Sequence, residues 1–156
     1  MSTSRALFKR YFAFDAWGNR LHLSFLKKHS EFNHRAEAMT LFSHLHATQQ
    51  VWHARIIGED SSRLDIWPDL SLAQSNKLID LNEKRWHELL GDHDLDLERV
   101  VTYQNSKGIP YENTLEELLS HLVIHGQHHR AQINTLISRS GLNPPAIDYI
   151  YYCRES

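Results

Sequence analysis

The apolar residues of the chain recur at intervals of three and four along four separate stretches, which is the spacing that one face of an α-helix produces. The stretches cover about residues 4–28, 35–57, 71–91 and 113–141, and turn-rich segments separate them. A long connection, residues 92–111, joins the third stretch to the fourth. Four amphipathic helices with one such crossover predict an all-α fold, an antiparallel four-helix bundle that forms a single domain over residues 1–156.

Local signals add detail to these elements. Ser71 is followed three residues later by Gln74, which predicts a capping box at the start of the third helix. The connection carries a β-branched run, residues 100–103, ahead of a turn segment with Gly and Pro, and we expect a short hairpin there. The aromatic tail, residues 146–156, is expected to pack back on the domain.

Composition excludes several classes of protein. The 156 residues are 41% hydrophobic and 23% charged, which is too apolar for a disordered chain and suits one compact domain. The net charge of -2 argues against nucleic-acid binding, because proteins that bind phosphates usually carry a basic surplus. No apolar run reaches the ~18 residues of a membrane span, and the first ten residues lack a signal-peptide core, so we expect a cytoplasmic protein. The single Cys153 excludes an internal disulfide and a cysteine-rich zinc site.

Histidine is the one residue type out of proportion, with twelve copies. His125 and His129 lie four residues apart within the apolar stripe that Leu122 and Ile133 help to define. Two imidazoles one helical turn apart on a buried face can chelate one metal ion, and the alternative is a pair of core histidines satisfied by hydrogen bonds. Gly126 stands where metalloproteases of the H-E-x-x-H pattern carry their catalytic Glu, which excludes that class.

A third ligand has to come from another helix, and the second helix offers three histidines. When Leu45 and Trp52 are taken as the inward side, His46 and His53 point towards solvent, whereas His44 lies at the border of the apolar face. His44 is therefore the one of the three that can reach the interior. Three His ligands with the remaining positions open are typical of a catalytic metal and not of a closed structural one.

Other polar and aromatic residues are expected to serve structure. Arg130 is predicted to point outward from the fourth helix, and we expect it to form a structural salt bridge there. His128 is expected on the surface or in a dimer contact. The four tryptophans are expected in the core or at an interface. The histidines expected on the solvated surface are His22, His29, His34, His87 and His93.

Four motifs occur together in order along nearly the whole chain. They are the run His125-Gly-Gln-His-His129-Arg130-Ala131-Gln132, the pair His44 and Trp52, the run Phe14-Asp-Ala-Trp17-Gly-Asn19-Arg20, and the tail Pro144-Pro145-Ala-Ile-Asp148-Tyr-Ile-Tyr. With these motifs the chain resembles the DinB-like family of small metal-binding proteins, which is unrelated to the DNA polymerase of that name. Ala131 stands where the family usually has Gly, a departure that leaves the histidines in place.

The resemblance implies a four-helix bundle with a nickel or zinc ion on His44, His125 and His129, and a homodimer. Family members with known activity include transferases and isomerases that use low-molecular-weight thiols. We therefore expect a metal-dependent thiol S-transferase, in which the metal holds a small thiol as the thiolate that attacks an electrophilic substrate.

Two alternatives stay open at this point. The same metal would also suit a hydrolase that activates water. A metal-binding or stress-response binding module without turnover is the other. His121, Tyr103 and Tyr149 are the candidates for contact with the ligands, the substrate or a transferred proton.

Overall fold

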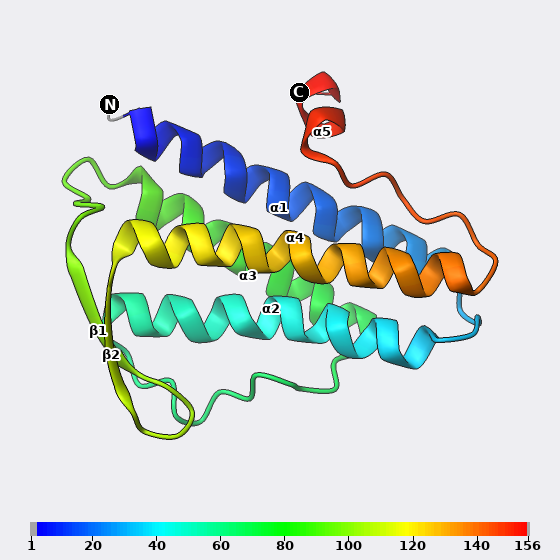
Figure 1. Cartoon of the computed structure of the whole chain (residues 1–156), viewed down its shortest axis with the longest axis horizontal. Coiled ribbons are helices and arrows are strands. Elements are labelled where there is room, and N and C mark those ends of the chain that lie inside the picture. Colours follow the sequence, from blue (N-terminus) through cyan, green and yellow to red (C-terminus); the bar gives the residue numbers. More distant parts are fainter. Residues whose placement is uncertain (1–2, 156) are drawn as a thin grey trace.

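The structure, a computed structural model, describes residues 3–155 and is mostly helical (Figure 1). The four predicted helices are present with small shifts at their ends, the predicted hairpin is present, and the tail forms a further short helix. The elements are α1 (Thr3–Lys28), α2 (Arg35–Ile57), α3 (Leu72–Gly91), β1 (Val100–Gln104), β2 (Pro110–Thr114), α4 (Leu115–Arg139) and α5 (Tyr149–Glu155).

The four long helices lie side by side (Figure 1). Both α1 and α2 pack against α3 and α4, so each long helix has two long neighbours. The hairpin lies at the end of the molecule where α2 ends and α4 begins, and its tip reaches towards the connection between α2 and α3 (Figure 1). Within residues 3–155, no helix combines the length and the apolar character needed to cross a lipid bilayer.

Local side-chain chemistry explains where the helices begin and end. The predicted capping box is confirmed: the Ser71 hydroxyl accepts from the Gln74 amide, and the Gln74 side chain accepts from the Ser71 amide. Thr114 and Glu117 form a second capping box at the start of α4. At the C-terminal end of α2, Gly58 adopts a left-handed conformation with a φ of 78°, which a glycine accommodates without steric cost.

The hairpin and the tail also follow the sequence. β1 pairs antiparallel with β2, with Val100 opposite Thr114. In the turn between them, the Asn105 side-chain oxygen accepts hydrogen bonds from two backbone amides. The tail packs back on α1 as expected: Tyr149 meets the Phe14 ring edge-on at 5.1 Å, and the Trp17 indole donates to Glu155 at 2.9 Å.

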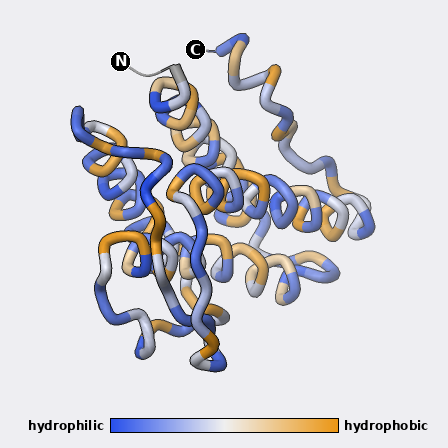
Figure 2. Tube along the Cα trace, turned by 60° about the vertical axis from the view of Figure 1, so that its left-hand side comes forward, coloured by the Kyte–Doolittle hydropathy of each residue, from blue (hydrophilic) through white to orange (hydrophobic). Residues whose placement is uncertain are grey.

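Two apolar clusters form the core, one towards each end of the long helices. In Figure 2 hydrophobic and hydrophilic residues alternate along each helical tube, as expected when one face is buried. We call the two apolar clusters the hairpin-end cluster and the far-end cluster. The hairpin-end cluster includes Phe8, Phe12, Ile56, Trp86, Leu90, Leu115, Leu119 and Leu122. The far-end cluster consists of Leu23, Leu26, Ala38, Phe42, Leu45, Ile79, Ile133 and Ile137.

Between the two clusters the core is polar, and this layer corrects three expectations. The sequence predicts His22, His46 and Arg130 at the surface, yet the exposed fraction of each is 0%. The assumption that each helix buries one apolar face is wrong here, because these helices are covered on more than one side. Residues 42–49 of α2 are buried without interruption, since the helix packs against α3, α4 and the connection that follows it.

Burial of His22 predicts a loss of stability in acid. Desolvation lowers the pKa of His22 from 6.5 to about 4, helped by the nearby Arg130 charge and opposed by the hydrogen bond that His22 Nε2 donates to the Asn134 side-chain oxygen. The unfolded chain binds a proton at this residue below pH 6.5, whereas the folded chain does not until about pH 4. Stability is therefore lost as the pH falls through this window.

Between pH 6.5 and pH 4, we expect the free energy of unfolding of His22→Gln, which keeps a neutral polar side chain, to fall by roughly 3 kcal/mol less than that of the wild type. Urea unfolding at several pH values, with a chelator present, measures the difference. His87→Gln serves as the control, because His87 is exposed on α3 and is not part of the buried layer. Identical pH profiles for His22→Gln and wild type would contradict this account of the buried imidazole.

Candidate metal centre

Three imidazoles from two helices converge at one point of the structure. His44 lies on α2, and His125 and His129 lie one turn apart on α4. The Nε2 atom of His125 is 3.3 Å from Nε2 of His44 and 3.0 Å from Nε2 of His129. One ring nitrogen from each residue lies within 4.8 Å of those of the other two. The structure thus brings together the three histidines that the sequence analysis selected.

Hydrogen bonds on the far side of two rings fix which nitrogen faces the centre. His44 Nδ1 lies 2.7 Å from the backbone oxygen of Ile66, and a carbonyl oxygen only accepts, so Nδ1 carries the proton. His129 Nδ1 lies 2.6 Å from the side-chain oxygen of Gln132, which fixes the second ring in the same way. Both rings therefore present an unprotonated Nε2 with its lone pair towards His125.

This arrangement fits a divalent metal ion. Tetrahedral coordination with metal–nitrogen bonds of about 2.05 Å places ligand nitrogens about 3.3 Å apart, close to the two separations observed. Without a cation, a proton on His125 Nε2 can serve only one of the two lone pairs that face it. A set of neutral nitrogen donors suits zinc, nickel, cobalt or iron and does not suit calcium or magnesium, which prefer oxygen.

The protonation of the three rings matches this geometry. Burial lowers the pKa of His125 to about 3, and the neighbouring imidazoles add to the effect. Burial also lowers the pKa of His44 and of His129 below the ordinary value of 6.5. All three rings are neutral near pH 7, which is the form that binds metals.

The centre is closed on one side and open on the other. His44 is buried, whereas His125 and His129 are each partly exposed. The Trp67 indole stacks on the His44 ring with centroids 3.6 Å apart and an interplanar angle of 7°. Trp67 itself is 52% exposed, so it forms an outer wall of the centre and does not lie in the core, which was one of the two places expected for it. Nothing in the sequence marked the connection that carries Ile66 and Trp67 as part of the site.

A buried polar network lies behind the metal centre and joins all four long helices. Arg130 of α4 donates to Asp15 of α1 at 2.5 Å, and Gln49 of α2 donates to the same carboxylate at 2.5 Å. The Trp86 indole of α3 donates to Gln49 at 2.9 Å. Asn19 of α1 completes the network, accepting from Arg130 at 2.9 Å and donating to Asp15 at 3.1 Å. The salt bridge expected of Arg130 exists, but it lies inside the protein.

The remaining candidate residues lie around the centre or away from it. His121 is exposed, with its ring 5.5 Å from the rings of both His125 and Trp52. The Tyr103 hydroxyl donates to Asn113 within the hairpin at 2.8 Å. Tyr149 packs on α1, a helix that supplies none of the three imidazoles. His53, expected to face solvent, is partly buried against the Trp86 ring.

Comparison with protein families now identifies the class. Residues 8–155 match the model of the DinB family, and the chain belongs to that family. The match covers nearly all of the chain, including the three converging histidines. No curated protein and no solved structure matches the chain.

The polar network makes a specific prediction about Gly126. A Cβ at this position would overlap Asp15 Oδ1 and lie 3.2 Å from a terminal nitrogen of Arg130. We expect Gly126→Ala to destabilise the metal-free protein by about 2 kcal/mol, because the buried ion pair has no room to move. Urea unfolding in the presence of a chelator measures the change.

Gly91 provides the matched control, because it is also helical but a Cβ there would meet no atom within 4 Å. Gly91→Ala should leave stability unchanged or raise it by up to about 1 kcal/mol, as alanine favours a helix. Equal effects of the two substitutions would show that Gly126 does not make room for the ion pair.

Proposed function

We propose that this DinB-family protein is a metal-dependent enzyme that activates a small thiol for transfer to an electrophilic substrate. The convergence of three Nε2 atoms, two of them with lone pairs that face the third ring, carries the proposal, because one bound cation satisfies all three nitrogens at once. His44, His125 and His129 would hold the metal, with nickel or zinc as the ions that the family resemblance implies. The four long helices would form the antiparallel four-helix bundle expected for the family, and the active protein would be a homodimer.

Partial exposure of the centre supports catalysis over a structural role. Structural zinc sites usually have four protein ligands, whereas three histidines leave positions for a substrate. A divalent metal held there supplies Lewis acidity, which lowers the pKa of a thiol and keeps it as the nucleophilic thiolate.

The protein's own residues orient the reactants around that centre. The Ile66 carbonyl accepts a hydrogen bond from His44 Nδ1, and the Trp67 indole stacks on the His44 ring, so these two residues hold the ring in place. Trp52 contacts the rings of His121 and Tyr103, and these three side chains form an aromatic wall between the imidazoles and the hairpin. Such a wall would exclude water from one side of the substrate and leave the exposed side for entry.

Metal binding is the first test. We expect wild-type protein, purified without an affinity tag, to bind one divalent ion per chain, and His125→Ala to lose it while its helical circular dichroism is retained. His87→Ala, on the exposed face of α3, should bind metal like the wild type. Elemental analysis and calorimetric titration with zinc or nickel give the readout. Full metal content in His125→Ala would rule out the proposed ligand set.

Thiol activation is the second test. With cobalt in the site, addition of 2-mercaptoethanol should produce a sulfur-to-cobalt charge-transfer band, and the loaded protein should accelerate conjugation of thiols to 1-chloro-2,4-dinitrobenzene. Both signals should disappear in His125→Ala. A protein that binds cobalt but shows neither signal with any thiol is not a thiol transferase, and turnover of ester substrates would then indicate the hydrolase.

A further inference from the structure

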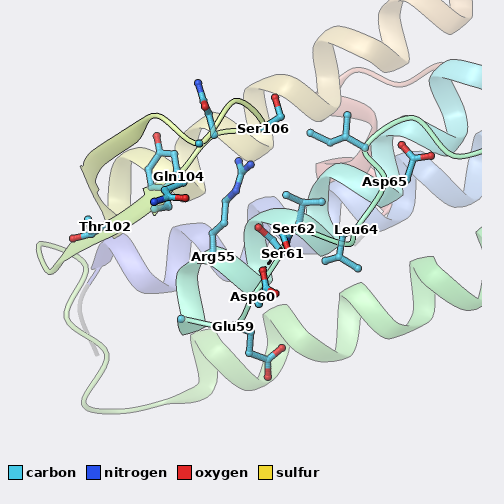
Figure 3. A pocket seen from close by; sticks show the side chains of 16 residues that line it. Arg55, Glu59, Asp60, Ser61, Ser62, Leu64, Asp65, Thr102, Gln104 and Ser106 are labelled. Carbon is cyan, nitrogen blue, oxygen red and sulfur yellow. Dashed lines mark hydrogen bonds between the residues drawn. The ribbon is translucent and has the colours of Figure 1, made fainter.

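A pocket of about 590 Å³, drawn in Figure 3, includes Ile66 in its lining, the residue whose carbonyl accepts the hydrogen bond from His44. Three segments line it: the second half of α2, the connection that follows α2, and the hairpin. A volume of this size holds a small organic molecule. The lining is rich in hydroxyl and amide groups, with Ser61, Ser62, Thr102, Gln104, Asn105 and Ser106 among its residues.

The pocket and the metal centre lie on the same side of α2. Arg55 follows His44 by eleven residues, and at 100° per residue the two side chains point within about 20° of each other. Their positions are about 16 Å apart along the helix axis, and ring contacts connect them: the Arg55 guanidinium packs on Trp52, Trp52 contacts His121, and His121 contacts His125. Ile66 lines the pocket and also accepts the hydrogen bond from His44, so the two sites share a residue.

Arg55 supplies an unused positive charge in this pocket. Its guanidinium carbon lies 4.6 Å from the centroid of the Trp52 ring and 5.6 Å from that of Tyr103. Its Nε atom is buried and has no hydrogen-bond partner in the part of the chain that the structure describes. Figure 3 shows the side chain extending from α2 towards Gln104 on the hairpin, away from Glu59 and Asp60. A partly desolvated guanidinium held by two rings and lacking an acidic partner is well suited to bind an anion.

The charges around the pocket favour a single carboxylate over a phosphate. Glu59, Asp60 and Asp65 also line the pocket, and their negative charge opposes a dianion. Asp60 and Asp65 already accept backbone hydrogen bonds from Ser62 and Trp67, which keeps them in the turns of the connection. A carboxylate instead matches one guanidinium, which can donate two parallel hydrogen bonds to it in a bidentate pair.

We propose that this pocket binds the carboxylate end of the substrate, with Arg55 as the residue that holds it. The inference rests on the proposed function, because it places the reacting group at the three imidazoles and the anionic end next to the hairpin. A molecule the length of a small peptide spans the two sites, since an extended chain covers about 3.4 Å per residue.

Thiol probes with free and with esterified carboxylates test this assignment on the cobalt-loaded protein. Glutathione carries carboxylates at both ends of a short peptide thiol, and its diethyl ester lacks them. We expect the wild type to bind glutathione about tenfold more tightly than the diester, by titration of the sulfur-to-cobalt band. Arg55→Gln should remove this preference, and Arg55→Lys should keep part of it because the charge remains.

Arg63→Gln is the matched control, since Arg63 lies on the same connection but is not part of the pocket lining. It should behave like the wild type. All variants should bind cobalt equally, because none is a proposed ligand. An unchanged preference in Arg55→Gln overturns the inference and leaves the thiol chemistry intact, whereas the absence of any sulfur-to-cobalt band, with 2-mercaptoethanol included, overturns the proposed function itself.

A second readout needs no metal. We expect butyrate, a monocarboxylate, to shift the Arg55 side-chain Nε–H signal in the NMR spectrum of metal-free wild-type protein, with no matching effect on Arg63. Inorganic phosphate is the dianionic comparison. No shift with butyrate overturns the subsite even if Arg55→Gln folds poorly, and tighter binding of phosphate than of butyrate overturns the choice of a carboxylate.

Discussion

The buried ion pair between Asp15 and Arg130 is the interaction on which the rest of the structure depends. Both side chains lie in the middle of the core, between two apolar clusters, and removal of either would leave a charge in a medium that solvates it poorly. Gln49 shares the Asp15 carboxylate, and Trp86 binds Gln49, so one carboxylate links all four long helices. The network therefore fixes the rotation of α4 about its axis, which decides where His125 and His129 point.

The candidate metal centre has two parts, which are positioned by different elements of the fold. His125 and His129 are held by a single helix, while the His44 ring is set by Ile66 and Trp67 from the connection after α2. The carbonyl of Ile66 decides which nitrogen of His44 is free, so a loop residue controls whether a helix residue can act as a ligand. This dependence of ligands on their outer hydrogen bonds is common to metal sites.

The two non-helical segments are also where the substrate would be selected. The connection after α2 and the hairpin before α4 line the pocket around Arg55, next to a centre that the helices build. Such a division would let the same helical scaffold and the proposed metal chemistry serve different substrates through changes in two loops.

The sequence by itself determined the local features: the helices, the capping box at Ser71, the hairpin, and the one-turn spacing of His125 and His129. Each depends on residues close together in the chain, so periodicity and turn chemistry report it directly. Tertiary structure decided the burial of His22, His46 and Arg130, because helices covered on several sides have no single inward stripe. It also brought His44, Ile66 and Trp67 together at one centre, and left the Arg55 charge without an acidic partner among residues 3–155. These contacts join segments distant in sequence, whose meeting only the packing of the whole chain fixes.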